Sequence, residues 1–307
     1  MSTSLDRLTL LETFTRIAER GSISAAARDL GLSQASASRQ LAQLEAQLGV
    51  VLIQRTTHRS ALTEAGKDCL AEALSLLEGW ETLAERYAGE DTQMRGKLKI
   101  VAPIALGQLH LAVAALGFQK THPGISITWL LDDAPIRFAE IGCDLWIKIG
   151  RVPDESLVVR PLGKVERMIV AAPDLLDGRQ TLTPSDLASV PCVALEPFEA
   201  GTIPLENDSG RTVTISASVA ITTNNMLAAR TAAKLGVGYA VMPRWFVEAS
   251  LRKGALIDLL PDWRASALAI NAAFQPSRRQ TRKLRAFIDH IATQIARVPG
   301  IEVEHAG

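Results

Sequence analysis

The chain has 307 residues, which is too long for one ordinary hydrophobic core and predicts two or three domains. Its composition, 47% hydrophobic and 21% charged, is typical of folded globular proteins rather than of disordered chains. Basic and acidic residues number 33 each, so the molecule has no net charge at pH 7. These values exclude a uniformly basic nucleic-acid-binding protein, and any contact with DNA requires a local surface.

The sequence carries no sign of export or of membrane insertion. No apolar run approaches the roughly 18 residues of a membrane span, and Asp6 and Glu12 interrupt the N-terminal segment, which does not resemble a signal peptide. Cys69, Cys143 and Cys192 are odd in number and far apart, as expected in a reducing compartment. We therefore expect a cytoplasmic protein with no membrane partner.

Signatures of catalysis and of metal binding are missing from the sequence. The five histidines show no metal-ligand spacing with one another or with cysteine. Asp132 and Asp133 are adjacent and are interpreted as a solvated loop rather than a catalytic pair. Cys143 and Cys192 could act as a redox pair only if the fold brings them together, and unpaired buried cysteines are the expectation. We expect no catalytic residue, no metal and no cofactor.

Taken in chain order, the first segments are predicted to be helices. The first helix ends near Gly21, and a short alanine-rich helix runs from the N-cap Ser22 to Gly31. A third helix runs from the N-cap Ser33 to Gly49. Residues 22–49 thus have the form of a helix-turn-helix, whose second helix can enter a major groove of DNA.

The helix expected after Ser33 has two different faces. One is an apolar stripe directed to the core, formed by Ala37, Leu41, Leu44 and Leu48. The opposite face carries small side chains and one arginine: Ala35, Ser36, Ser38, Arg39 and Ala42. Small residues permit close approach to base edges, and Arg39 can make a bidentate contact with guanine. Ser33 and Gln34 lie at the positive end of the helix, which suits a phosphate. An ordinary helical pair with a solvated face remains the alternative.

A basic hairpin is predicted next, over residues 51–63. Its tip places cations and hydroxyls where a wing would contact phosphate or the minor groove: Arg55, Thr56, Thr57, His58 and Arg59. The hairpin favours DNA binding over the alternative. However, residues 1–66 hold 7 arginines against 6 acids, a net charge of only +1. A ligand-binding protein whose N-terminal domain has lost DNA binding therefore stays open, and a salt-dependent titration would distinguish the two.

One long helix is predicted from Thr63 to about Ala88. Two seven-residue apolar series run along it, namely Leu70, Leu77 and Ala84, and Ala73, Trp80 and Tyr87. Sustained spacing of three and four is the seam of a two-stranded coiled coil. An amphipathic helix packed on its own chain is the alternative.

After residue 96, short predicted strands alternate with helical patterns at 108–119, 226–235 and 282–296. The strand-like segments are KLKIVAP, ISITWLL, DLWIKIG, RMIVAAP, PCVAL, VTISA and GYAVMP. This alternation indicates parallel sheets in an α/β architecture.

Residues 22–66 resemble the DNA-binding domain of the LysR-type transcriptional regulators. The resemblance rests on Ala25, Ala26, Ala27, Leu30, Ser33, Gln34, Ser38, Arg39, Leu44, Glu45, Leu48, Gly49, Arg55, Thr56 and the run LTEAG at 62–66. It implies that Ser33, Gln34, Ser36, Ser38 and Arg39 face DNA, that the wing contacts the backbone, and that two chains pair through the long helix. Two residues depart from the family pattern: Ile53 stands where a Phe is often found, and His58 where a basic residue is usual.

Four later segments are residues 97–133, GCDLWIKIG, TPSDLASVPCVAL and AARTAAKLGVGYAVMP. They resemble parts of the effector-binding domain of that family, which has the fold of periplasmic solute-binding proteins. The resemblance implies two subdomains, 97–163 with 267–300 and 164–266, that share a cleft. Ligands of open α/β sheets bind beyond the carboxyl ends of strands. The expected cleft residues are therefore Pro103, Ile104 and Ala105, Lys148, Ile149 and Gly150, and Thr223, Asn224 and Asn225, where a helix begins.

The chemistry of this expected cleft departs from the family pattern. Members often carry a hydroxyl in the first loop to hold a carboxylate, whereas this chain has Pro103-Ile104-Ala105-Leu106. A bound anion would then depend on Lys148 and on the helix start near Thr223. The alternative is that Lys148 lies on the surface or in a salt bridge.

The sequence thus predicts an α+β multi-domain regulator: a winged helix-turn-helix at 1–62, a linker helix at 63–94 and an α/β effector domain of two subdomains at 95–300. The expected partners are double-stranded DNA, a small-molecule effector, and further copies of the chain in a dimer or tetramer, with RNA polymerase as another candidate. An enzyme built on the α/β half is the remaining alternative, and the lack of a nucleophile or acid/base cluster disfavours it.

Overall fold

The computed structural model describes residues 6–55, 60–87, 94–176, 178, 182–198, 201–276 and 281–303. The chain folds as two compact units, residues 1–92 with 280–282, and residues 93–279 with 283–307. Among the residues in these ranges, no helix has both the length and the apolar character that a membrane crossing requires.

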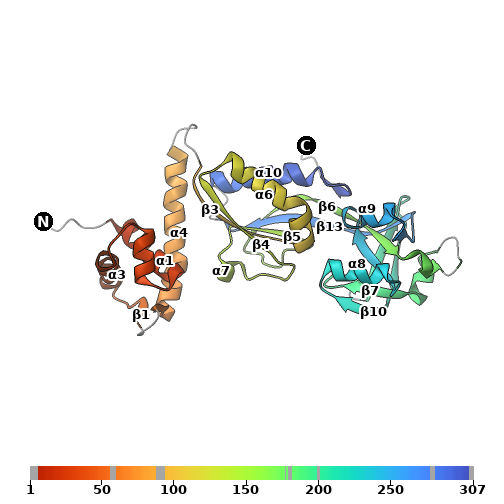
Figure 1. The fold of residues 1–307 in the computed structure, drawn as a ribbon, viewed down its shortest axis with the longest axis horizontal. Coiled ribbons are helices and arrows are strands. Elements are labelled where there is room, and N and C mark those ends of the chain that lie inside the picture. Colours follow the sequence, from red (N-terminus) through yellow and green to blue (C-terminus); the bar gives the residue numbers. More distant parts are fainter. Residues whose placement is uncertain are drawn as a thin grey trace. The chain divides into compact units, whose positions relative to one another are not determined.

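The first unit is a winged helix-turn-helix followed by a long helix (Figure 1). Its elements are α1 (Arg7–Arg20), α2 (Ile23–Asp29), α3 (Gln34–Leu48), β1 (Ile53–Arg55), β2 (Ser60–Leu62) and α4 (Glu64–Tyr87). The hydroxyl of Ser22 accepts a hydrogen bond from the amide of Ala25, and that of Ser33 from the amide of Ser36, so both serines cap their helices. Gly21 and Gly49 end α1 and α3 in the left-handed conformation, with φ of 58° and 73°. The expected helix starts and ends are thereby confirmed.

The core of this unit forms where α1 crosses α3. Leu10, Phe14 and Ile17 of α1 are buried together with Leu41 and Leu44 of α3. The prediction that Leu48 continues this stripe is wrong, because its side chain is 49% exposed. Leu48 is the last residue of α3, and the chain turns at the following glycine before Leu52 enters the core in its place.

The long helix α4 has two different apolar surfaces. Near its start, Ala73 is only 1% exposed and Leu70 packs beside it on the core of the unit. The expectation that Ala73 lies on a dimer seam is therefore wrong, and this part of α4 follows the amphipathic alternative. Further along, Leu76, Trp80 and Leu83 are 60%, 53% and 44% exposed, at spacings of four and three residues. Only Trp80 is shared with the expected seam.

The second unit is built on a mixed sheet with strand order β10-β7-β11-β6-β13-β5-β3-β4. Its first half pairs β3 (Gly96–Ala102) in parallel with β4 (Ile125–Leu131) and β5 (Leu145–Ile149). Its second half pairs β7 (Pro191–Leu195) in parallel with β10 (Ser218–Thr223) and β11 (Tyr239–Pro243). The expected parallel pairing is confirmed within each half.

Two long antiparallel strands, β6 (Val158–Ala171) and β13 (Trp263–Phe274), join the halves. The pairing runs from Val158 opposite Phe274 to Arg167 opposite Ala265. The expectation of a short strand over RMIVAAP, residues 167–173, was wrong in extent, and no strand was expected at 263–274. The shorter strands are β8 (Thr202–Asn207), β9 (Thr212–Ser216), β12 (Ile257–Asp258) and β14 (Ile301–Glu302).

Helices cover both halves (Figure 1). On the first half, α6 (Ala112–Thr121) and α10 (Arg282–Ile295) share one core, and the rings of Phe118 and Phe287 meet edge to face at 5.1 Å. The helical pattern expected from residue 108 begins as a π-helix at Gly107–Leu111. The remaining helices are α5 (Ile104–Leu106), α7 (Phe138–Ile141), α8 (Met226–Lys234) and α9 (Arg244–Arg252), with 3₁₀ turns at Pro173–Leu176 and Asp186–Ser189. Cys143 and Cys192 lie in separate core clusters, and neither forms a disulfide.

Candidate DNA-reading surface and ligand pocket

The solvent face of α3 carries the side chains expected to contact DNA. Gln34, Ala35 and Arg39 are exposed, and Arg39 forms no ion pair with any residue in the described ranges. The hydroxyls of Ser33 and Ser36 are 2.9 Å apart, so both take part in the helix cap. Ser38 is half-buried. An exposed arginine beside short side chains is a surface that can approach base edges closely.

The wing is tied to α3 and α4 by side-chain hydrogen bonds. The Glu45 carboxylate, on α3, accepts the amides of Leu52 and Ile53 at 2.8 and 3.2 Å. Thr63 donates its hydroxyl to the carbonyl of Val51 at 2.7 Å and accepts the amide of Gly66 at 2.9 Å. A side chain at Gly66 would overlap the carbonyl oxygen of Leu52, so the close approach of α4 requires glycine there.

The expected wing contacts are only partly visible. Arg55 ends β1, and its backbone pairs with Ser60 in the antiparallel hairpin. Thr56, Thr57, His58 and Arg59 lie outside the described residues. Their contact with DNA stays a prediction, as does that of the Arg55 side chain.

The near-neutral charge of residues 1–66 is not spread evenly. Arg16 pairs with Glu19 at 2.9 Å and Arg20 with Asp29 at 2.5 Å, so two acids are neutralised on α1 and α2. Residues 33–44, which include the first turns of α3, contain no acid at all. The carboxylates that lower the net charge therefore do not oppose DNA at the solvent face of α3.

A cavity lies between the two halves of the second unit and opens to solvent; its empty space, with the open solvent at its mouth included, is about 720 Å³. Its walls come from the ends of strands in both halves, with Val165 and Leu268 of the joining strands between them. The first half contributes Pro103, Ala105, Leu106, Asp132, Asp133, Ile147, Lys148 and Ile149. The second half, together with β6, contributes Arg167, Leu195, Glu196, Pro197, Phe198, Asn224, Met226, Val241 and Pro243.

Five of the nine residues expected at the cleft line this cavity: Pro103, Ala105, Lys148, Ile149 and Asn224. The other four do not line it and make hydrogen bonds that hold neighbouring segments. Ile104 donates its amide to Asp133 at 3.0 Å, and the Gly150 carbonyl accepts from Asn271 at 2.9 Å. Thr223 accepts the amide of Asn225, whose own side chain caps α8.

The sequence interpretation missed several residues of the cavity. Asp132 and Asp133, interpreted as a solvated loop, follow β4 directly, and Glu196 to Phe198 follow β7. The strand-end rule that selected Pro103 would have found them had it been applied to these strands. Arg167 lies within β6, and no such signal marks it.

Lys148 is buried in the cavity wall, with only 9% of its surface exposed. Its ammonium lies 3.5 Å from the backbone carbonyl oxygen of Asp133 and 5.7 Å from the centre of the Trp146 ring. No carboxylate of the described residues lies within ion-pair distance. Burial lowers the pKa of Lys148, while the more distant Asp133 and Asp132 oppose that shift. Both alternatives for this residue, a surface position and a salt bridge, are therefore wrong.

The carboxyl group of Asp133, which also lines the cavity, has a shifted pKa as well. Burial raises its pKa, and the hydrogen bond from the Ile104 amide and the charge of Lys148 act in the opposite direction. Asp132 is exposed and accepts the amide of Ala134 at 2.9 Å, as in a turn. Both aspartates are thus used to shape the loop after β4.

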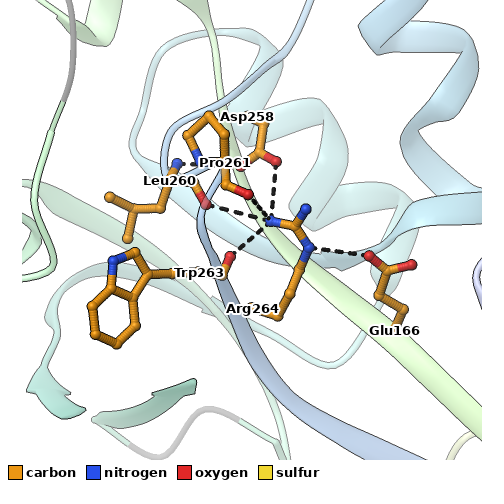
Figure 2. A network of polar contacts seen from close by, with 6 residues as sticks. All are labelled: Glu166, Asp258, Leu260, Pro261, Trp263 and Arg264. Carbon is orange, nitrogen blue, oxygen red and sulfur yellow. Dashed lines mark hydrogen bonds and ion pairs between the residues drawn. The ribbon is translucent and has the colours of Figure 1, made fainter. Parts of the chain in front are cut away.

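Arg167 is 6% exposed and donates its Nε to the carbonyl of Ser266 at 2.8 Å. Figure 2 shows how the strand beside it is held: Arg264 of β13 pairs with Glu166 at 3.0 Å and with Asp258 at 3.5 Å. Arg264 also donates to the carbonyls of Pro261, Trp263 and Leu260. Because successive side chains of a strand point to opposite faces, fixing Glu166 on one face directs Arg167 to the other.

A winged helix-turn-helix joined to an α/β unit with a cavity between its two halves defines the class of a ligand-responsive DNA-binding regulator. Residues 8–67 match the bacterial regulatory helix-turn-helix proteins of the lysR family, and residues 91–296 match the LysR substrate binding domain. The second match alone covers more than half of the chain. The chain belongs to the LysR family of transcriptional regulators, with a DNA-binding and an effector-binding domain.

Relatives of similar length support this assignment. The chain is 31% identical to YhjC, an uncharacterized HTH-type transcriptional regulator of Escherichia coli, over 94% of this chain and 97% of that protein. It is 30% identical to the HTH-type transcriptional regulator PtxR of Pseudomonas aeruginosa, over 97% and 98%.

Solved structures of full-length proteins share the fold. The Vibrio cholerae virulence activator AphB is 25% identical, with a TM-score of 0.56 over 94% of this chain and 99% of that chain. A full-length variant of OxyR from Pseudomonas aeruginosa has a TM-score of 0.69 at 17% identity, over 98% and 99%, which shows likeness of fold alone.

Proposed function

We propose that α3 and the wing read a specific DNA site, and that a small molecule in the cavity of the second unit controls this binding. The reading surface comprises Ser33, Gln34, Ala35, Ser36, Ser38 and Arg39, with residues 55–59 on the DNA backbone. The single observation that carries the proposal is the exposed Arg39, without an ion pair among the described residues, on an acid-free stretch of α3. Arginine is the residue that most often reads guanine.

The alternative of a ligand-binding protein without DNA function rests on the near-neutral charge of residues 1–66. Residues 33–44 contain no acid, however, and Glu19 and Asp29 pair with Arg16 and Arg20 on α1 and α2, so these acids do not lie on the reading helix. The proposal places the protein in the cytoplasm, where it meets the DNA. It assigns no enzymatic reaction, because a binding site that switches a regulator needs no chemical step.

The proposal includes a second copy of the chain. Leu76, Trp80 and Leu83 form an exposed apolar stripe on α4 at the spacing of a helix-pair seam. Pairing along this stripe joins two reading surfaces, so that a palindromic site with half-sites one DNA turn apart is expected. A pair of such dimers would form a tetramer.

The experiment is a selection of duplexes from a random pool by the full-length protein, followed by titration at several salt concentrations. We expect a two-half-site sequence that binds at least about a thousandfold tighter than unselected DNA, within the usual range for specific sites. Selection that enriches no sequence, with equally weak binding of all duplexes, would instead support the binding-protein alternative.

A further inference from the structure

Two buried cations, Lys148 and Arg167, are among the residues that line the cavity of the second unit. Lys148 lies on β5 opposite Asn271 of β13, and Arg167 lies on β6 opposite Ala265 of the same strand. Six residues of β13 separate these positions, which corresponds to about 20 Å at roughly 3.3 Å per residue. The side chains of Val165 and Leu268 line the cavity between them.

The acids of the same cavity occupy different positions. Asp132 and Glu196 are exposed at its rim, where water screens their charge. Asp133 is half-buried, but its carboxylate accepts the Ile104 amide and lies beyond ion-pair distance of Lys148. Lys148 is therefore more deeply buried than any of the three carboxylates among the described residues that line the cavity.

The buried ammonium group of Lys148 forms no ion pair among the described residues. A bound anion would supply the counter-charge that it lacks. Ionic groups taken out of water cost free energy unless a counter-charge or hydrogen-bond partner compensates them. Lys148 has one long contact to a backbone carbonyl and three ammonium protons to donate. Arg167, the second cation among the lining residues, already donates a hydrogen bond to the carbonyl of Ser266.

The rest of the cavity is apolar. Leu106, Ile149, Met226, Val241, Val165 and Leu268 are among its lining residues, and Phe198 supplies an aromatic ring. No hydroxyl group stands in the loop 103–106, so an anion finds no hydrogen-bond donor side chain there. A ligand that fits both features has one negative group and an apolar body.

We propose that the cavity binds a small organic acid, with its carboxylate on the Lys148 ammonium and its aliphatic or single-ring body against Val165, Leu268 and Phe198. This inference rests on the function proposed above and specifies its effector by chemical class. A cationic ligand is disfavoured, because its charge would lie beside Lys148. The acid would contact both halves of the sheet and so stabilise one arrangement of them.

The test uses calorimetric titration of the full-length protein with matched probes. Phenylacetate and 3-methylbutanoate are compared with their carboxamides, which keep the shape and lose the charge, and with phenethylamine. We expect the acids to bind about tenfold to a hundredfold more tightly than the amides, as a charge-assisted hydrogen bond implies. Amides or the amine binding as tightly as the acids, or no acid binding at millimolar concentration, would overturn the proposal.

Variants of Lys148 locate the carboxylate. Lys148→Met should abolish the preference for acids over amides, and Lys148→Arg should retain it. Unchanged acid binding by Lys148→Met would remove this residue from the site, and Lys148→Gln provides the same comparison if the methionine variant does not fold. Binding of selected duplexes is measured on the same samples and separates the two proposals. Intact DNA binding without acid binding refutes only the proposed class of ligand. Acid binding without specific DNA binding refutes the proposed function.

Discussion

Trp80 is the residue on which the proposed pairing of two chains depends most. It is the middle member of the exposed stripe on α4, between Leu76 and Leu83, and about half of each side chain is open to solvent. Full burial of a large apolar side chain contributes about 1.5–3 kcal/mol, so covering these exposed halves contributes roughly 1 kcal/mol per residue. Six such residues from two chains supply roughly 6 kcal/mol.

Trp80→Asp removes two of these contributions and buries two like charges in their place. Uncompensated buried ions cost several kcal/mol each, so the dimer should weaken by at least about 3 kcal/mol, which is more than a hundredfold in its dissociation constant. Ser75→Asp is the matched control, because it adds the same charge to an exposed position of α4 about 100° around the helix from Leu76.

The assay is sedimentation equilibrium over a range of protein concentrations, together with titration of a two-half-site duplex. We expect Trp80→Asp to be monomeric where the wild type and Ser75→Asp are dimeric, and to bind the duplex as weakly as a single half-site. A Trp80→Asp protein that stays dimeric with full affinity for DNA would refute the assignment of this stripe to the pairing of chains.

Three further predictions concern the wing, the joining strands and the cavity. Arg55→Ala should weaken binding to all duplexes and reduce the slope of log K against log salt by about one, whereas an unchanged slope would make Arg55 structural. Arg264→Ala should lower the free energy of unfolding, measured in urea, by about 1–3 kcal/mol, since it breaks charge-assisted hydrogen bonds. Arg151→Ala is the control and should change this free energy little, because the ion pair of Arg151 with Glu155 is exposed. Equal effects of the two substitutions would contradict the role of the Arg264 network. The pKa of Lys148 is lowered in the folded chain, so the unfolded chain binds more protons at pH values between that pKa and 10.5. The free energy of unfolding of the wild type should therefore rise with pH in this window, and that of Lys148→Met should not. A parallel pH dependence in both proteins would show that Lys148 is not the titrating group.

Features set by local chemistry could be predicted from the sequence. Ser22 and Ser33 cap their helices and Gly49 ends α3 because capping depends on residues that are neighbours in the chain. The parallel strands that end at Ala102 and Ile149 carry the apolar runs typical of buried strands. The strand-end rule then predicted that Lys148 lies at the cleft, and Lys148 is one of the residues that line the cavity.

Features set by tertiary contacts could not be predicted in this way. The heptad pattern of α4 does not show that Ala73 is buried in the core that α4 shares with α1 of its own chain, while Leu76 is left open. The strand β13 is rich in alanine and lacks alternation, so its pairing with β6 and β5 decides its conformation. Arg167 enters the cavity only because that pairing brings the middle of β6 to it.

The central claim is that α3 reads bases through Arg39. Its most direct test compares the affinities of the wild type and of Arg39→Ala for a selected duplex and for random DNA. Both proteins are titrated by fluorescence anisotropy at the same salt concentration, because affinity for DNA depends strongly on salt. The account predicts a loss of about 1–3 kcal/mol on the selected duplex, roughly tenfold to a hundredfold in affinity, and almost no change on random DNA. Equal losses on both duplexes would contradict it and would assign Arg39 to a phosphate.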